Sequence, residues 1–219
     1  YQDGDTLKVI SAGRHGYIKC FDGGSGAEIW SVHSGTILDA SATVDPSNGN
    51  IYAPAGDNDI RVMGLDKDGN PLWGNPSVLV YDWVSGANNP QRAQSTGCLS
   101  HDGSTFYFQT NSSQGDGCLY AVNTSDGSLK WSLDTGSTGW EIPSSSPVVT
   151  RNKVVIVGNN DGDRYYAVQD SGTEPVILDI LAVDDSGNAR ASATLSSTGQ
   201  LYLPVRTTWT AGNASLSPD

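Results

Sequence analysis

Four clusters of acidic residues are the part of this sequence whose spacing first suggests chemistry. They read "DNDIR" from Asp57, "DKDGN" from Asp66, "DGDR" from Asp161 and "DDSGN" from Asp184. Carboxylate and amide oxygens are the ligands that Ca²⁺ prefers, so each cluster is a candidate calcium loop. None has the EF-hand spacing of ligands at loop positions 1, 3 and 5, Gly at 6 and Glu at 12. Because Asp and Asn also satisfy backbone donors in turns, we favour turn chemistry and assign no metal site, leaving loop calcium as the alternative.

The nucleophilic and imidazole side chains show no catalytic arrangement. The three histidines lie in turns of different segments, and no nucleophile motif with Ser or Cys accompanies them. The cysteines, Cys20, Cys98 and Cys118, are too scattered for a structural zinc site. Cys98 and Cys118 are expected on the first and third strands of one sheet, nearly 10 Å apart, which predicts no disulfide between them. We therefore assign no catalytic residue.

Two tryptophans outside the repeat described below are the better candidates for ligand binding. Trp83 lies in an insertion of about twenty residues, and Trp140 occupies the corresponding link further along the chain. Each has charged neighbours, Arg92 and Glu141 respectively. An aromatic face beside polar groups suits a sugar or another polar ligand with an apolar face. Aromatic side chains that fill gaps between sheets are the alternative, and the sequence favours that alternative.

Charge and composition narrow the classes of partner. The formal net charge is −12, so the surface field repels nucleic acid and anionic lipids. No run of apolar residues is long enough to span a membrane, and the chain starts without Met or a basic leader, as a processed or partial chain would. Sequons at Asn111, Asn123 and Asn213 are glycosylation candidates of a secreted protein, although chance gives a similar number.

An internal repeat organises the elements that must position these residues. "GAEIW" (Gly26 to Trp30), "GNPLW" (Gly69 to Trp73) and "GSLKW" (Gly127 to Trp131) share one spacing, and each follows an apolar strand that ends in Asp or Asn. We interpret "DILAVD", followed by "GNARA" at 187–191, as a fourth copy in which Ala191 replaces the tryptophan and weakens the outer strand. Glycine supplies the positive φ of the turn, and the tryptophan is placed to pack against the next sheet.

A second element completes four strands per repeat. "ASATVDPSNGNIYAP" from Ala40 and "ASATLSSTGQLYLP" from Ala191 align with a single gap, and weaker copies lie between them. Their anchoring serines, at 41, 95, 145 and 192, are 54, 50 and 47 residues apart. That spacing is typical of a β-propeller built from four-stranded antiparallel blades, with a solenoid as the less favoured alternative. The 26 glycines and 10 prolines agree with an all-β chain of many turns.

The repeat resembles the tryptophan-docking repeat of pyrroloquinoline-quinone-type (quinoprotein-like) β-propellers. The resemblance runs from about Leu7 to Thr208 and implies one propeller domain or propeller portion over 1–219, with repeats at about 7–37, 38–91, 92–141, 142–190 and 191–219. Both ends fall at second strands, and members usually have seven or eight blades. About four to five blades are therefore represented, and the resemblance implies completion by further blades of the same protein or by another chain.

The resemblance predicts the fold more firmly than the function, because the same repeat occurs in dehydrogenases and in scaffold proteins. The family's enzymes carry an adjacent cysteine pair against the quinone, and no such pair occurs here. We therefore expect a non-enzymatic extracellular or periplasmic scaffold that presents its inter-blade loops to a protein or glycan ligand. The alternative is a fragment of a quinoprotein alcohol or sugar dehydrogenase that binds pyrroloquinoline quinone and Ca²⁺.

Overall fold

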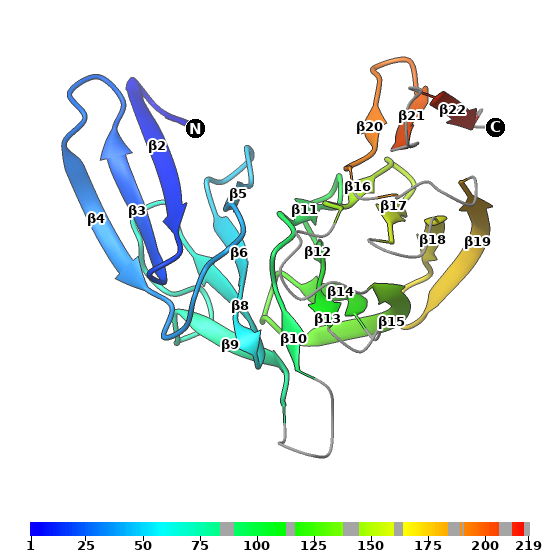
Figure 1. Cartoon of the computed structure of the whole chain (residues 1–219). Helices are drawn as coiled ribbons and strands as arrows, with labels where there is room; N and C mark the ends of the chain where they lie inside the picture. The colour runs from blue at the N-terminus through cyan, green and yellow to red at the C-terminus, as the bar shows by residue number, and fades with distance from the viewer. Residues whose placement is uncertain are drawn as a thin grey trace.

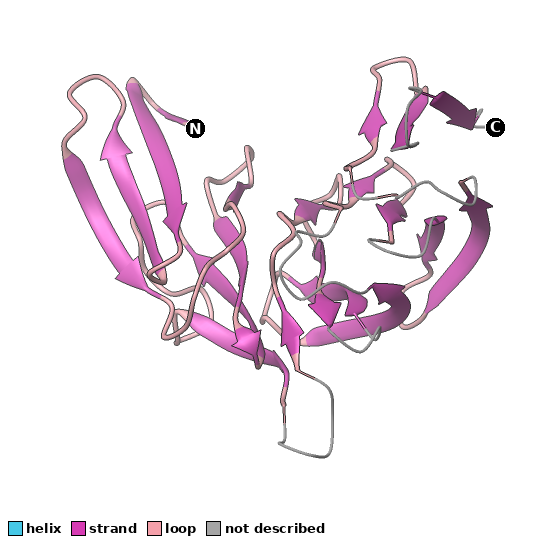
Figure 2. Ribbon diagram, viewed as in Figure 1, coloured by secondary structure: helices cyan, strands magenta, loops and turns pink. Residues whose placement is uncertain are grey.

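The computed structural model describes residues 1–83, 90–112, 117–137, 145–159, 164–183, 189, 191–205 and 212–216. All regular structure in these ranges is β-strand (Figure 2). Strands with β-branched and aromatic side chains alternate with turns rich in Gly, Asp and Ser, as the composition predicts. Within the described ranges there is no helix long and apolar enough to cross a bilayer.

Five antiparallel sheets follow one another in chain order, with the first and the fifth at opposite ends of the row (Figure 1). The first sheet contains β1 (Gln2–Asp3), β2 (Thr6–Gly13), β3 (Tyr17–Asp22) and β4 (Glu28–His33). The second contains β5 (Thr43–Val44), β6 (Ile51–Ala55), β8 (Ile60–Leu65) and β9 (Ser77–Tyr81). The third contains β11 (Cys98–Leu99), β12 (Thr105–Gln109), β14 (Gly117–Asn123) and β15 (Leu129–Ser137).

The fourth sheet contains β16 (Val148–Val149), β17 (Val154–Gly158), β18 (Arg164–Asp170) and β19 (Pro175–Ala182). The fifth contains β20 (Thr194–Leu195), β21 (Leu201–Val205) and β22 (Gly212–Leu216). A separate small sheet joins β7 (Asp57–Asn58), β10 (Gln91–Arg92) and β13 (Asn111–Ser112) in the order β13-β10-β7. Four-stranded antiparallel sheets stacked in series are the arrangement expected for propeller blades.

The apolar core lies between successive sheets rather than within one centre. Ile18 of the first sheet packs with Met63 of the second. Farther along, Val62 packs with Phe108, Leu119 with Val157, and Tyr165 with Leu203. Central strands such as β6 and β12 are therefore buried on both faces, which explains their continuous apolar character.

Hydroxyl groups also tie the sheets together where each short first strand begins. The amide of Ser41 donates to Thr96 Oγ1 (3.2 Å), that of Thr96 to Ser146 Oγ (3.0 Å) and that of Ser146 to Ser192 Oγ (2.9 Å). The equivalent residues are thus Ser41, Thr96, Ser146 and Ser192. The expected register of these anchors was wrong by one residue in the third and fourth sheets, because several adjacent hydroxyl residues made the alignment ambiguous.

Both ends of the strand assignment need correction. The chain does not enter at a second strand, because β1 pairs with β2 through Gln2 and Leu7. Nor does the fifth sheet stop at its second strand, because β22 pairs with β21. The two-residue strand β1 carries too little periodicity to be recognised from sequence.

The proposed fourth copy of the glycine turn was also wrong. "DILAVD" belongs largely to the outer strand β19, and the third strand and its turn are β18 and Ser171–Glu174. β19 has eight residues, so the expected weakening of this strand by Ala191 does not occur. The third strand β18 and the outer strand β19 are both apolar, and each is followed by Asp and Gly. The sequence pattern alone therefore could not tell which of them is the third strand.

Candidate functional site

The small sheet gathers polar residues at one end of the second and third sheets. Arg92 lies opposite Asp57 on one side and Asn111 on the other. Its Nη2 atom is 2.8 Å from Asp57 Oδ2, and its side chain is only 12% exposed. The Asp57 side chain is 29% exposed, so the guanidinium of Arg92 is the more enclosed member of this ion pair.

Beneath the ion pair, Gln91 organises a buried hydrogen-bond network. Its Oε1 atom accepts hydrogen bonds from Thr110 Oγ1 (2.6 Å) and from Tyr120 Oη (2.8 Å). Burial, as the first cause, raises the pKa of Tyr120, so this phenol remains a hydrogen-bond donor at physiological pH. The network therefore fixes β10 against β14 and gives the Arg92 side chain a rigid base.

The structure describes two of the four residues that were predicted to bind a ligand. The structure brings Trp83 and Arg92 to the same short segment, since the backbone amide of Trp83 donates to Asp59 Oδ1 (2.9 Å) while Arg92 pairs with Asp57. Trp83 is half-buried. Trp140 and Glu141 lie outside the described residues. Of the four, only the Trp83 and Arg92 pair can thus be placed at one site.

The repeat tryptophans make contacts across two sheet boundaries. Trp30 donates its indole N–H to the carbonyl of Lys67 (3.3 Å), and Trp73 donates to the carbonyl of Thr124 (3.0 Å). Each ring lies against a glycine of the next turn, because a Cβ built on Gly69 or Gly127 would be 2.8 or 2.7 Å from a ring carbon. These two glycines have φ of +87° and +75°, and Gly26 has +74°, as the repeat predicts.

Trp73 packs against Gly127 although it does not lie on a strand. The sequence predicts an outer strand through "GNPLW", but β9 begins only at Ser77, and Trp73 lies in a turn. Pro71 lacks an amide hydrogen and Gly74 has a φ of +78°, so a regular ladder cannot run through this segment. The ring is held between Gly64 of its own sheet and Gly127 of the next.

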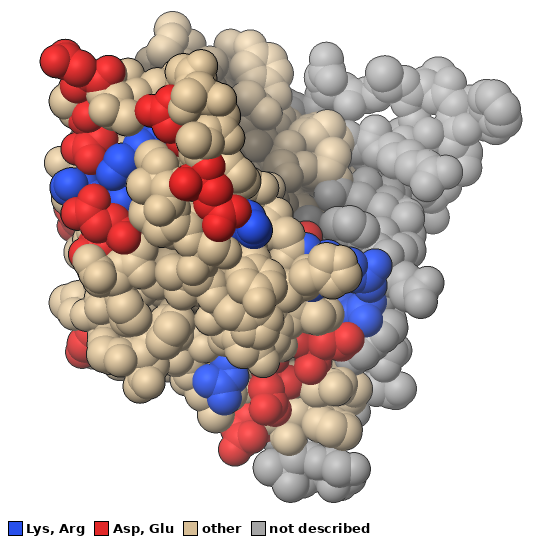
Figure 3. Space-filling view, turned by 90° about the vertical axis from the view of Figure 1, so that its left-hand side faces the viewer, with Lys and Arg blue, Asp and Glu red and all other residues tan. Residues whose placement is uncertain are grey.

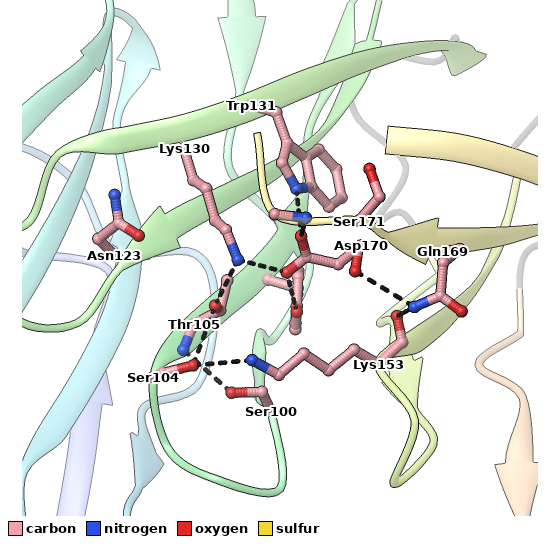
Figure 4. Close-up of polar contacts among 12 residues, drawn as sticks. Ser100, Ser104, Thr105, Asn123, Lys130, Trp131, Lys153, Gln169, Asp170 and Ser171 are labelled. Atoms are coloured by element: carbon pink, nitrogen blue, oxygen red, sulfur yellow. Dashed lines mark hydrogen bonds and ion pairs between the residues drawn. The ribbon is translucent and has the colours of Figure 1, made fainter. Parts of the chain in front are cut away.

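At the third boundary the acceptor is a carboxylate rather than a carbonyl. Asp170 receives hydrogen bonds from Trp131 Nε1 (3.0 Å), Lys130 Nζ (2.7 Å) and Tyr107 Oη (2.6 Å), as Figure 4 shows in part. The carboxylate of Asp170 is fully buried. Burial raises its pKa, but the bonds from Lys130, Tyr107 and Trp131 outweigh burial and hold the pKa below its usual value. Asp170 is therefore ionised and joins the two sheets.

A second cation crosses the same boundary. Lys153, in the turn before β17, contacts Asp102 (2.8 Å) and Ser104 (3.1 Å) of the third sheet. Sequence reasoning missed Asp170, Lys130 and Lys153. Placing "YYAVQD" rather than "DILAVD" in the repeat would have shown that Asp170 occupies the position of the turn aspartates.

The acidic clusters that fall in the described residues are used within the fold. Asp66 accepts from the backbone amides of Asp68 and Asn70, both at 2.8 Å, while Asp57 and Asp59 hold Arg92 and Trp83. The clusters at 161 and 184 begin outside the described residues. Where side chains are described, no three His, Cys, Asp or Glu residues are grouped as metal ligands.

The sequons also differ in position. Asn111 is fully buried in β13, and its side chain donates to Gln94 Oε1 (3.1 Å). A glycan on Asn111 would require the small sheet to open. Asn123 is half-buried at the end of β14 and donates to Ser128 Oγ (2.9 Å). The backbone of Asn213 is in β22, but its side chain is outside the described set.

A family comparison agrees with this architecture. The family model described as "Outer membrane protein assembly factor BamB" matches residues 14–201, which is most of the chain. This chain belongs to the BamB family. The predicted relationship to pyrroloquinoline-quinone-type repeats is thereby confirmed. No curated protein matches this BamB-family chain in sequence.

Solved structures show how widely the fold is shared. The chain superimposes on BamB from Moraxella catarrhalis with a TM-score of 0.62 at 14% identity, covering 97% of this chain and 56% of that one. A europium-containing methanol dehydrogenase gives 0.61 at 14% identity, with 93% and 50% covered. A chain of the mitotic checkpoint complex gives 0.65 at 13% identity, with 92% and 58% covered.

Identities this low establish the fold alone: an all-β chain with β-propeller neighbours. The BamB-family chain spans little more than half of the Moraxella protein that it matches. Because an assembly factor, an oxidoreductase and a checkpoint complex share the arrangement, the function has to be argued from the residues above.

Proposed function

We propose that this chain is a non-enzymatic binding scaffold in extracytoplasmic protein assembly, and that it presents the small-sheet end of its blades to a protein partner. One observation carries the proposal. Three described residues with the chemistry for catalysis, Asp170, Arg92 and Asp66, are engaged in joining sheets or closing turns. The family match, whose description is that of an assembly factor, supports the same conclusion.

The small-sheet end is favoured over other surfaces for a physical reason. Trp83 combines an apolar ring with polar neighbours at the end of a rigid scaffold, and such aromatic side chains are enriched in protein interfaces. The buried Gln91 network keeps Arg92 in place before a partner arrives, so little entropy is lost on binding. A glycan ligand would bind the same Trp83 ring, so glycan binding is the alternative to a protein partner.

In this proposal each sheet is one blade of a propeller, the repeats have the limits given by the sequence, and further blades of the same protein or of another chain complete the ring. The protein works in the periplasm or outside the cell, and the family model's description as an outer-membrane protein assembly factor supports this location. No quinone or metal takes part. The competing proposal is that the chain is part of a quinoprotein dehydrogenase.

Photo-crosslinking in cells that make the natural protein tests this function. A photoreactive amino acid replaces Asp82, which is exposed beside Trp83, or His101, which is exposed at the opposite end of the third sheet. We expect one discrete protein adduct from position 82 and none from position 101. Adducts of equal yield from both positions, or none from position 82, would contradict the proposal.

A further inference from the structure

The outer strand of the fourth sheet is strongly apolar for a strand at the edge of a sheet. β19 is the last strand in the order β16-β17-β18-β19, so no described strand pairs with its outer edge (Figure 1). Four of its eight side chains are large, apolar and 42–57% exposed: Val176, Ile177, Leu178 and Ile180. Neighbouring apolar side chains on an open strand edge indicate an interaction surface.

The outer strands of the first three sheets do not share this property. β4, β9 and β15 each have one exposed large apolar side chain, namely Ile29, Leu79 and Leu129. β9 has only five residues, and β4 and β15 carry charged residues such as Glu28 and Lys130. Figure 3 shows the side on which β2–β4 lie in Figure 1, with acidic and basic side chains scattered over it. Short or charged edges prevent unwanted strand pairing, so β19 lacks a protection that its counterparts have.

The exposure of β19 is a property of the strand rather than of a missing neighbour. Ile177 lies opposite Val168 and Ile180 lies opposite Tyr166. Val168 and Tyr166 belong to the core between the third and fourth sheets. Because opposite residues of a sheet share a face, Ile177 and Ile180 lie on the side of the third sheet. All four strands of that sheet are described, and the two isoleucines remain exposed beside it.

Charge gives the apolar edge a negative centre. Asp179 is the one charged residue of β19, and its side chain is exposed. Its Oδ1 atom accepts the backbone amide of Ile180 (2.8 Å), so the carboxylate occupies a donor of the edge strand. Glu174 adds a second negative charge before the strand, while Arg164 lies at the far end, opposite Ala182.

We propose that β19 pairs with an extended strand of another protein, in which apolar and polar side chains alternate and a lysine or arginine lies opposite Asp179. Backbone hydrogen bonds supply the affinity in this mode of binding, and alternate side chains supply the specificity. The basic group draws the Asp179 carboxylate away from Ile180 and releases its amide for the incoming strand. An acidic residue at the same place is rejected, because like charges on opposite residues destabilise a sheet.

A second copy of this chain fits the edge poorly. Antiparallel pairing of two β19 strands about their centre would bring two Asp179 carboxylates close together. The formal net charge of −12 also makes two copies repel one another. The occupant is therefore a strand with a basic residue from a different protein. This inference goes beyond the proposed function and does not rest on it, because the small-sheet end belongs to other strands.

Fluorescence anisotropy with the natural full-length protein tests the edge. The probe is a labelled, capped peptide with the sequence VTIKVTV. Its control has the same side chains but methyl groups on the three central backbone nitrogens, which removes donors that pairing needs. We expect the probe to bind at least ten-fold more tightly than the control. Leu178→Lys should weaken binding at least ten-fold, whereas Leu79→Lys, at an exposed leucine of the outer strand β9, should leave it unchanged.

A charge exchange separates strand recognition from apolar attraction. Asp179→Lys should weaken binding of the lysine peptide and strengthen binding of VTIEVTV, in which glutamate replaces lysine. All three substituted side chains are exposed, so the variants should fold. Equal binding of the methylated and unmethylated peptides, no binding of the probe, or equal effects of Leu178→Lys and Leu79→Lys would overturn the proposal.

Two further measurements distinguish other occupants of the same edge. A dimer in light scattering that Leu178→Lys dissociates would assign the edge to a second copy. Sedimentation with phosphatidylcholine vesicles that Leu178→Lys abolishes would assign it to a membrane surface. Either result overturns the stated occupant, and we expect neither. None of these results changes the crosslinking expected at position 82.

Discussion

Trp131 and Asp170 form a hydrogen bond of 3.0 Å across the boundary between the third and fourth sheets. Both residues are almost completely buried, at 5% and 6% exposure. The same carboxylate also accepts the ammonium of Lys130. One side chain thus joins the two sheets at three points, in addition to their apolar packing and the contacts of Lys153 and Ser146.

Replacing Asp170 with Asn should therefore destabilise the protein strongly. The variant keeps the shape of the side chain but leaves the 15%-exposed ammonium of Lys130 without its counterion. Loss of one partner of a buried ion pair costs about 3 kcal/mol. Urea unfolding measures the change, with the exposed Asp5→Asn as a control that should stay within about 0.5 kcal/mol of the parent. Equal stabilities of the two variants would show that the buried bond contributes little.

Stability should decrease in acid through the same residue. Asp170 has a lower pKa in the folded protein than the value of about 3.9 expected for the unfolded chain. A depressed pKa contributes stability above the unfolded pKa, and this contribution is lost as the pH falls through the folded value. The contact with Lys153, as the first cause, likewise lowers the pKa of Asp102.

Melting temperatures at pH 6 and pH 3 test this dependence. The parent should lose more stability between these values than Asp170→Asn, which has no proton to gain at that position. Parallel curves for the two proteins would mean that Asp170 titrates normally. Asp102→Asn should have a smaller effect, because its carboxylate is 53% exposed and solvent screens it.

Two glycines with nearly the same backbone angle should respond differently to alanine. Gly26 and Gly127 have φ of +74° and +75°, so each substitution incurs about 1 kcal/mol of strain. Only at Gly127 does the new methyl group meet the Trp73 ring, at 2.7 Å, so Gly127→Ala should cost about 1–3 kcal/mol more. Chemical denaturation of both variants measures the difference. If they are equally stable, Trp73 is not held against Gly127.

The thiol of Cys98 is half-buried, and its raised pKa should make it unreactive in the folded protein. Burial raises its pKa to about 12, so almost no thiolate is present at pH 8. Alkylation at pH 8 followed by peptide mapping should modify Cys98 only after denaturation. Rapid labelling in the native state would show that β11 opens readily.

The sequence predicted the repeating architecture because its signal is local. Gly69 and Gly127 precede Trp73 and Trp131 by the same number of residues in the sequence, and the strands covered on both faces are continuously apolar. Cys98 and Cys118 accordingly fall on the first and third strands of one sheet, and no disulfide joins cysteines in the described part of the chain. These features depend on neighbours a few residues apart.

The errors arose where distant residues decide the structure. Pro71 and Gly74 interrupt the strand expected at Trp73. The Trp73 ring nevertheless packs against Gly127, because its indole N–H donates to the carbonyl of Thr124 in the third sheet. The Asp170 site depends on Tyr107 and Lys130, which are 63 and 40 residues away. Contacts at such separations leave no periodic trace in one sequence.

The claim that this fold serves binding rather than oxidation is tested most directly by dye-linked dehydrogenase activity. The natural full-length protein is incubated with pyrroloquinoline quinone and Ca²⁺, and dye reduction is followed with alcohols and sugars beside a quinoprotein dehydrogenase as positive control. We predict no substrate-dependent reduction, because Asp170, Arg92 and Asp66 are committed to the structure. Substrate-dependent dye reduction that requires the added quinone would contradict the account.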